Sequence, residues 1–189
     1  MAWSQEHKIK TRQKILNSAA QLFTQNGFDH VGINDVMRHA GLTRGAFYTH
    51  FSSKAELYAE SIVAAAMEIG HRTDPDHPDV PPLESIIKTY LSMEHRKGET
   101  LRCPLAFLTT DMTQRDEQVR NAYTRVFKGF VNNLGKHLEQ QNGYADTQKS
   151  MQQAVMMIGG LAISRALNDD TLASELLDSC HAALTTQSN

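Results

Sequence analysis

The stretch "AGLTRGAFYTHFSSKAEL", residues 40–57, decides the fold of the first part of the chain. It contains a turn at Gly41, a short helix-like segment over 43–50, and then Ser53 and Glu56 at the spacing of a capping box. A short helix that follows another across a tight glycine turn is typical of a helix-turn-helix. The short segment carries glycine, arginine and tyrosine where a buried helix would carry alanine and leucine. We therefore expect its outer face to meet a partner.

The sequence on either side of this stretch indicates an all-α protein. No sustained alternation of β-branched, aromatic and polar residues predicts a strand. Apolar residues at helical spacing predict four N-terminal helices, over residues 8–25, 34–39, 43–50 and 54–70. Asn34 is expected to be the N-cap of the second helix, and Asn26-Gly27 is expected to end the first.

A loop over residues 71–82 holds four of the five prolines, and no helix could cross it. Beyond it the pattern predicts further helices over residues 83–97, 105–112, 116–141, 146–167 and 170–185. We therefore expect two domains. Residues 1–58 would form a three-helix helix-turn-helix domain, and residues 59–189 would form a second helical domain.

The composition limits the class of protein. The chain has 189 residues, of which 40% are hydrophobic and 21% charged, as in ordinary globular proteins. No apolar run reaches the roughly 20 residues that span a bilayer, and the N-terminus lacks the apolar segment of a signal peptide. We therefore expect a cytoplasmic protein with no membrane partner. No pattern of residues predicts a metal site or a cofactor.

Charge is divided unevenly along the chain. The net charge is −2, but residues 1–58 hold seven Lys or Arg against four Asp or Glu, whereas the remainder holds twelve against seventeen. A basic N-terminal part joined to an acidic C-terminal part would steer its basic end toward a polyanion.

The side chains of the short segment suit double-stranded DNA. Arg44 can bond guanine O6 and N7 in the major groove, and Thr43 can contact a thymine methyl group or a phosphate. Gly45 would let the backbone approach closely. Hydroxyl, imidazole and ammonium groups that follow are suited to phosphates, which fix the register of a complex without reading its sequence. They belong to Tyr48, His50 and Lys54.

The motifs "TRQKILNSAAQLFTQNGFDHVGINDV", residues 11–36, and "AGLTRGAFYTHFSSKAEL" together resemble the N-terminal domain of the TetR family of bacterial transcriptional regulators. One position departs from it, because Gly32 stands where many members carry threonine. The resemblance implies that DNA is contacted by Asn34, Arg38, Thr43, Arg44, Gly45, Tyr48, His50 and Lys54.

The same resemblance implies that the C-terminal domain binds a small-molecule effector and forms a homodimer. The chain would then be a repressor that leaves a palindromic operator when the effector binds. Candidate lining residues of an apolar effector pocket are Cys103, Phe107, Met112, Phe127, Phe130 and Met156. Candidate residues of the dimer interface are Ile158, Leu161, Leu172 and Leu176, and Gly159-Gly160 would allow another helix to approach closely.

Two alternatives stay open from the sequence. Cys103 precedes a predicted helix start at Pro104 and follows Arg102, and both neighbours would lower the pKa of its thiol. A repressor switched by oxidants or electrophiles through Cys103 is therefore one alternative. Cys180, by contrast, suits a small buried position.

A helical enzyme or adaptor without DNA binding is the second alternative. The motifs GxSxG, HExxH and CxxC are absent, so we predict that the chain is not an enzyme.

Overall fold

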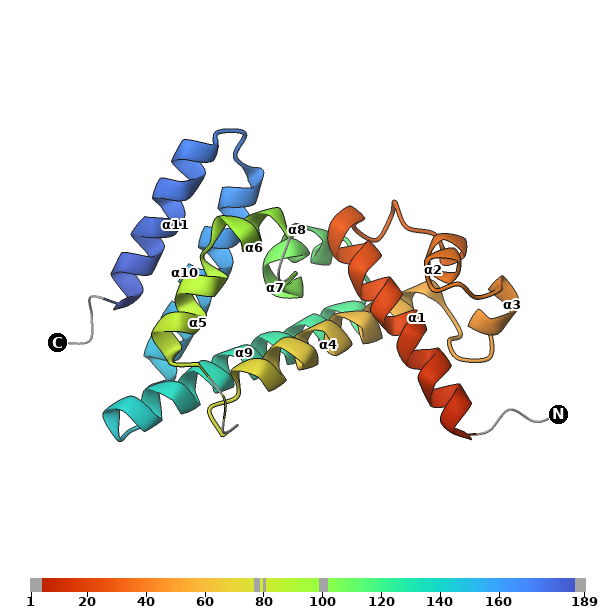
Figure 1. Cartoon of the computed structure of the whole chain (residues 1–189), viewed down its shortest axis with the longest axis horizontal. Helices are drawn as coiled ribbons and strands as arrows, with labels where there is room; N and C mark the ends of the chain where they lie inside the picture. The colour runs from red at the N-terminus through yellow and green to blue at the C-terminus, as the bar shows by residue number, and fades with distance from the viewer. Residues whose placement is uncertain (1–4, 77–78, 80, 99–101, 186–189) are drawn as a thin grey trace.

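The computed structural model describes residues 5–76, 79, 81–98 and 102–185, and all regular elements in this part are helices. The predicted all-α fold is confirmed. The described residues form eleven helices, which Figure 1 labels. They are α1 (Gln5–Asn26), α2 (Ile33–His39), α3 (Arg44–Phe47), α4 (Lys54–Thr73), α5 (Leu83–Tyr90), α6 (Met93–Lys97), α7 (Pro104–Phe107), α8 (Thr109–Met112), α9 (Glu117–Asn142), α10 (Thr147–Ala166) and α11 (Asp170–Thr185).

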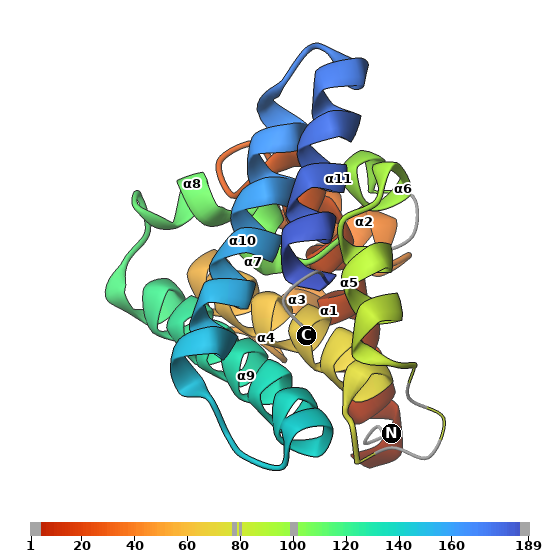
Figure 2. The same cartoon turned by 90° about the vertical axis from the view of Figure 1, so that its left-hand side faces the viewer.

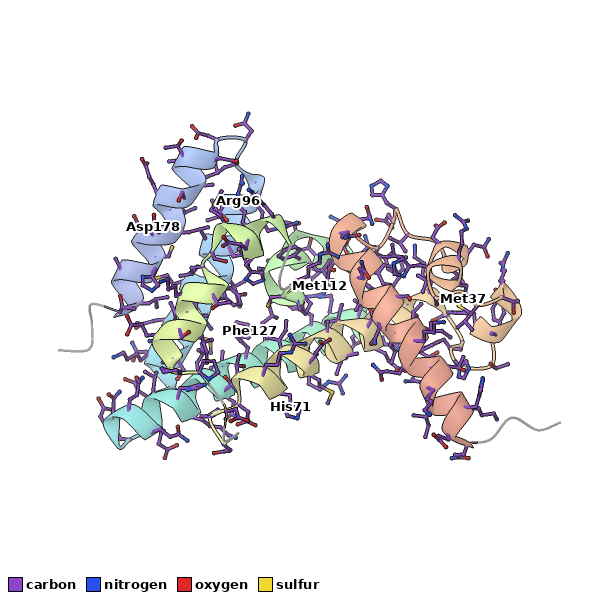
Figure 3. The ribbon with its side chains drawn as sticks, viewed as in Figure 1. Met37, His71, Arg96, Met112, Phe127 and Asp178 are labelled. Carbon is purple, nitrogen blue, oxygen red and sulfur yellow. The ribbon has the colours of Figure 1, made fainter. Side chains whose placement is uncertain are left out.

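The helices α1, α2 and α3 with the start of α4, residues 5–58, form what we call the head, and residues 59–185 form the body (Figure 1). α1 ends at Asn26 because Gly27 turns the chain with φ +74°, a conformation that favours glycine. The head packs around large side chains that are fully buried. Among these are Ile15, Phe23, Met37, Phe47 and Tyr58, and Figure 3 labels Met37 within this packing.

The long helix α4 joins the head to the body, since it packs on α1 at one end and runs beside α9 (Figures 1 and 2). Its N-cap is Ser53, whose Oγ accepts the Glu56 N–H at 3.0 Å, as the sequence predicts. The second half of the predicted capping box is wrong. The Glu56 carboxylate accepts from the N–H of Ser52, at 2.7 Å, and from the Ser52 hydroxyl, instead of from Ser53.

The middle of the chain is more broken than its apolar pattern predicts. The helix expected over 83–97 is divided at Leu91, because the Ser92 side chain caps a new helix by accepting the His95 N–H at 3.1 Å. The helix expected over 105–112 is divided at Leu108. Leu91 and Leu108, the residues at the two breaks, are both buried. The breaks therefore occur at positions where an apolar side chain packs into the core.

Helices α10 and α11 pack against each other at one side of the body (Figure 2). Their close approach depends on Gly160, where a Cβ atom would lie only 2.8 Å from the Cys180 Sγ. The apolar core is continuous from head to body, and Met112 lies in it, 6% exposed (Figure 3). Among the described helices, none is both long enough and apolar enough to cross a membrane.

Candidate functional site

The turn between α2 and α3 has helix-turn-helix geometry. Gly41 adopts φ +63°, and the Leu42 N–H returns to the Met37 carbonyl at 2.8 Å. Phe47 is fully buried, so it fixes the short α3 to the head. The opposite face of α3 is left at the surface.

This outer face carries the groups that the sequence predicts. Thr43, Arg44, Gly45 and Tyr48 are exposed, and Tyr48 keeps 58% of its surface. The Arg44 guanidinium lies 3.5 Å from the Tyr48 hydroxyl and has no acidic partner in the part of the chain that the structure describes. A Cβ on Gly45 would meet nothing closer than the Thr43 hydroxyl at 4.0 Å, so the backbone is open to a partner. The face can therefore offer a forked cation and two hydroxyls to a base edge or a phosphate.

The four other predicted contact residues lie outside α3. Asn34 and Arg38 are exposed on α2, where Arg38 lies 3.5 Å from Asp35. The prediction that Asn34 is the N-cap of α2 is wrong. Gly32 takes that place, and its N–H donates to the Asp35 carboxylate at 2.9 Å.

His50 and Lys54 are partly covered. Burial is the main cause that lowers the pKa of His50, with repulsion by Arg12 and Lys8 added, so this imidazole is neutral at neutral pH and donates as a neutral group. The Lys54 ammonium lies 4.1 Å from the centre of the Phe28 ring, and burial lowers its pKa as well. Phe28 thus engages Lys54 in this conformation.

A cavity of about 340 Å³ lies between α4, α7 and α9 in the body. Of the six predicted lining residues it contains Cys103 and Phe130. Its other apolar lining comes from Val63, Ala66, Met67, Ile69, Leu105 and Val126. Its polar lining comes from Thr73, Asp74, Arg125, Asn132, Asn133 and Lys136. The sequence does not indicate α4 as a wall of the cavity, because the pairing of α4 with α9 is not visible in a local pattern.

The structure does not bring the remaining four predicted residues to this cavity. Phe107 stacks on His95, with ring centres 5.8 Å apart, and the Arg165 guanidinium lies 3.4 Å above its ring. Met112 is buried in the core, Phe127 lines a separate depression on α9, and Met156 is partly buried against the core. These four side chains are used for packing.

The predicted activation of Cys103 is wrong. The side chain is 4% exposed, and burial raises the pKa of its thiol despite the Tyr90 hydroxyl at 3.3 Å. Arg102 does not offset this, because its Nε donates to the Gly98 carbonyl at 3.0 Å. Cys103 is therefore a neutral thiol in the cavity wall at neutral pH.

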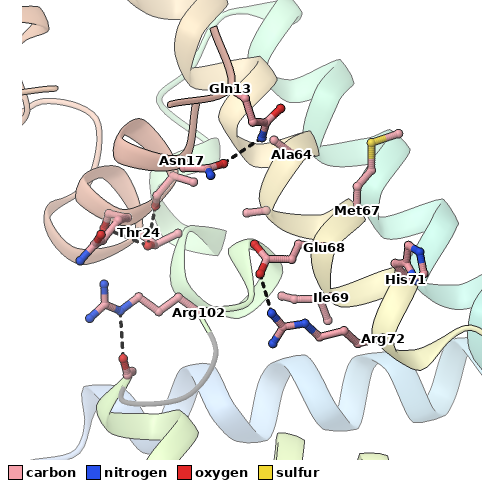
Figure 4. Close-up of a pocket in the computed structure, with 14 residues that line it drawn as sticks. Gln13, Asn17, Thr24, Ala64, Met67, Glu68, Ile69, His71, Arg72 and Arg102 are labelled. Carbon is pink, nitrogen blue, oxygen red and sulfur yellow. Dashed lines mark hydrogen bonds and ion pairs between the residues drawn. The ribbon is translucent and has the colours of Figure 1, made fainter. Parts of the chain in front are cut away.

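A second and larger hollow, of about 1060 Å³, lies between α1, α4 and Arg102 (Figure 4). Its polar side chains largely bond one another. Gln13 donates to Asn17 at 2.8 Å, and Arg72 pairs with Glu68 at 2.7 Å. Because its polar groups are already engaged in this way, the smaller and more apolar cavity is the better candidate for a ligand.

The predicted dimer residues divide into two groups. Ile158 and Leu161 are 8% and 0% exposed, so they are already packed inside their own chain, and their assignment to an interface between chains is corrected. Leu172 is 48% exposed and Leu176 is half-buried. The large exposed apolar side chains on α10 are instead Met151, Val155 and Ile163. Met151 and Val155, four residues apart, lie on one face, and Ile163, eight residues further along, lies about 80° around the helix from Val155.

Comparisons with known proteins agree with the geometry of the head. Residues 15–61 match the family described as "Bacterial regulatory proteins, tetR family". The chain is 24% identical to the uncharacterized HTH-type transcriptional regulator YxaF of Bacillus subtilis, over 85% of this chain and 88% of that protein. It is 39% identical to the HTH-type transcriptional regulator AcrR of Shigella flexneri, over 32% of this chain and 28% of that one.

The fold is shared over nearly the whole chain with a solved structure, the reduced form of NemR from E. coli. The TM-score is 0.77 at 18% identity, over 94% of this chain and 96% of that one. The family match, over residues 15–61, includes the helix-turn-helix, whereas the match to NemR also includes the body.

Proposed function

Because the chain belongs to the TetR family of bacterial regulatory proteins, we propose that it is a homodimeric repressor that leaves a palindromic operator when an effector binds. The chain is a DNA-binding transcriptional regulator and not an enzyme. The observation that carries the proposal is the outer face of α3, where Arg44 and Tyr48 are exposed beside a bare Gly45. Because an operator lies on chromosomal DNA, we also propose that the protein acts in the cytoplasm.

The contact residues of the proposal are those of the sequence analysis, in residues 1–58 as the DNA-binding domain. Arg44 and Thr43 would read bases, and Tyr48 and His50 would bond phosphates. Lys54 would reach a phosphate after leaving Phe28. Asn34 and Arg38 would add contacts from α2. A two-fold dimer would set two such faces about one helical turn of DNA apart, roughly 34–36 Å, and so would require a palindrome.

The experiment is a selection of bound duplexes from random DNA by the full-length protein. We expect an enriched palindrome, bound by two chains per duplex in sedimentation equilibrium. Enrichment of no sequence at all would sink the proposal. Enrichment of a single half-site by one chain would remove the dimer and keep the DNA-binding function.

The dimer surface is proposed to include the exposed face of α10 with Leu172 and Leu176 of α11. Val155 is 58% exposed in the single chain, and an arginine there would place a charge in the interface. We expect Val155→Arg to yield monomers in sedimentation, whereas Tyr144→Arg, in the loop before α10, leaves dimers intact. Dimers that persist in Val155→Arg would move the interface to another face.

The proposed effector is a largely apolar small molecule that also carries a polar group, because the cavity is lined mainly by apolar side chains together with some polar ones. Binding between α4 and α9 would shift α4, the helix that packs on the head. The two α3 helices of the dimer would then no longer match the spacing of the operator. Val126→Trp, which fills the cavity, should keep operator binding and abolish release by any effector. Release that survives in Val126→Trp would place the effector elsewhere.

A second candidate signal is covalent modification of Cys103, which its position in the cavity wall favours and its raised pKa opposes. A maleimide tests it, since the thiol sulfur bonds one alkene carbon and the proton passes to the other. Loss of operator binding on treatment with N-ethylmaleimide, absent in Cys103→Ser but present in Cys180→Ser, would favour this signal. Operator binding by the wild type that is unchanged after this treatment would exclude the covalent signal and leave the non-covalent effector as the candidate.

A further inference from the structure

An arginine of the body binds an acidic residue of the head across 86 positions of sequence. Arg115, which follows α8, donates from Nη1 and Nη2 to the two carboxylate oxygens of Asp29, at 3.1 and 2.8 Å. Asp29 lies in the turn between α1 and α2. The planar guanidinium and carboxylate thus meet in the forked geometry that fixes orientation as well as distance.

Arg115 is held in place by another residue of the body. Its Nε donates to the Asp111 carbonyl at 3.2 Å, and its Nη2 lies 3.3 Å from the Asp111 carboxylate. The Arg115 side chain is only 10% exposed, whereas the Asp29 side chain is 68% exposed. The body therefore presents a fixed cation onto which the turn of the head docks. The same cation holds the pKa of Asp29 below its usual value.

Two further contacts join the same parts of the molecule. The Tyr58 hydroxyl donates to the second oxygen of Asp111 at 2.6 Å, and the Arg115 guanidinium lies 4.6 Å from the centre of the Phe28 ring. Phe28 packs in turn against Tyr58, with ring centres 5.1 Å apart. Aromatic and charged contacts thus surround the Asp29 pair, and we call the five residues Phe28, Asp29, Tyr58, Asp111 and Arg115 the head clamp.

We propose that Arg115 is a positioning residue for operator binding, which sets the tilt of the head on the body through Asp29 and Phe28. The inference rests on the proposed function, since only a dimer on a palindrome measures the separation of two heads. An exposed ion pair contributes little to stability. Here its consequence is geometric, because a small change of tilt at the turn is carried to α3 at the other side of the head.

The test uses the palindrome selected by the wild-type protein, with one base pair added to or removed from its centre. The wild type should bind the natural spacing best. Arg115→Ala should bind that spacing roughly tenfold more weakly and should discriminate less among the three duplexes, because its heads sample more tilts. A spacing profile in Arg115→Ala identical to that of the wild type overturns the inference.

Two variants separate positioning from a general loss of structure. Arg120→Ala removes an exposed arginine of α9 that has no ion pair with any of the described residues, and it should behave as the wild type. The charge exchange Asp29→Arg with Arg115→Asp should recover at least part of the spacing discrimination that either single change loses. Failure of the exchange together with a normal profile for Asp29→Ala would assign the role to packing and not to the ion pair, and would overturn the proposal.

A measurement without DNA keeps the inference separate from the proposed function. Spin labels on Lys8→Cys in the head and Glu139→Cys in the body, with Cys180→Ala, report the head-to-body distance in protein diluted with unlabelled chains. Arg115→Ala should broaden this distance distribution, and Arg120→Ala should not. If the wild type binds no DNA and the distribution is unchanged in Arg115→Ala, both the proposed function and the clamp fail. If it broadens, the clamp holds the head, and only the operator function is lost.

Discussion

The head and the body of this protein expose their charges in opposite ways. On α3 the Arg44 guanidinium is exposed and has no acidic partner among the described residues. In the body Arg96 is 10% exposed and bonds the carbonyls of Ser164 and Leu167 and the carboxylate of Asp170. The head thus keeps the Arg44 cation ready for an external polyanion, whereas the body uses the Arg96 cation to hold helices together.

The difference also separates the two kinds of site. A surface for DNA can be built from one short helix, because the partner supplies the opposite charge and shape. A cavity for an effector needs walls from several helices, and the walls of the cavity proposed for it come from α4, α7 and α9. The function of the head should therefore be lost when single side chains are removed, and that of the body when its packing is disturbed.

The largest expected effect is on DNA affinity. Arg44→Ala should weaken operator binding by about a thousandfold, since a forked arginine contact contributes roughly 1–3 kcal/mol in each of two chains. Arg72→Ala removes an equally exposed arginine of α4, paired with Glu68, and should leave affinity within about twofold. Filter binding at constant salt measures both. Equal losses in the two variants would mean that α3 has no special role and would remove the contrast between head and body.

The next effect is on the stability of the body in acid. Burial lowers the pKa of His95 to about 4, and its Nδ1 bonds the Tyr90 carbonyl at 2.8 Å. The unfolded chain takes up the proton near pH 6.5 but the folded chain only near pH 4. Stability is therefore complete above pH 6.5 and falls by about 3 kcal/mol as the pH drops to 4.

Urea unfolding of the wild type and of His95→Gln at pH 7.5, 6, 5 and 4.5 measures this loss. The variant is expected to be less stable at pH 7.5, because it loses the ring contacts to Tyr90 and Phe107, but to depend less on pH over this range. Carboxylates contribute equally to both proteins, so the difference between the two curves isolates His95. Parallel curves would show that His95 does not carry the acid sensitivity.

The sequence was informative about the head because the head's function is local. Gly41, Arg44 and Tyr48 lie within eight residues, and their spacing alone predicts both the turn and the exposed face. The body could be predicted only as a set of helices. Val63 and Val126 line one cavity from α4 and α9, and nothing in either segment indicates that these helices pair.

Errors in the body follow from the same cause. The residue types of Phe107 and Met112 predict a place in the pocket, but an apolar type predicts burial and not what a side chain is buried against. Cys103 was assigned a low pKa from its neighbours in sequence, whereas burial by Tyr90 and other segments far along the chain decides it. The apolar type of Ile158 and Leu161 likewise predicts burial, but it does not show that they are buried within their own chain and not between two chains.

A smaller effect compares two adjacent glycines of α10. A methyl group on Gly160 would meet Cys180 and Leu91, whereas one on Gly159 would meet nothing within 4 Å. Gly160→Ala should lower the free energy of unfolding by about 1–2 kcal/mol through overpacking. Gly159→Ala should raise it by roughly 0.5–1 kcal/mol, because alanine favours the helix. Denaturation curves check both. A loss of stability in Gly159→Ala would mean that the exposed side of α10 is already covered, as a dimer partner would cover it.

The smallest effect concerns the helix that connects the two regions. Ser53→Ala removes the N-cap of α4 and should cost about 1 kcal/mol, whereas Ser52→Ala loses only the exposed hydroxyl contact to Glu56, keeps the backbone N–H contact, and should cost less. Because α4 packs on both α1 and α9, the loss should appear equally in hydrogen exchange of the most protected amides of α1 and α10. Faster exchange in α1 alone would show that the head unfolds independently, so that the two regions differ in folding as well as in their exposed charge.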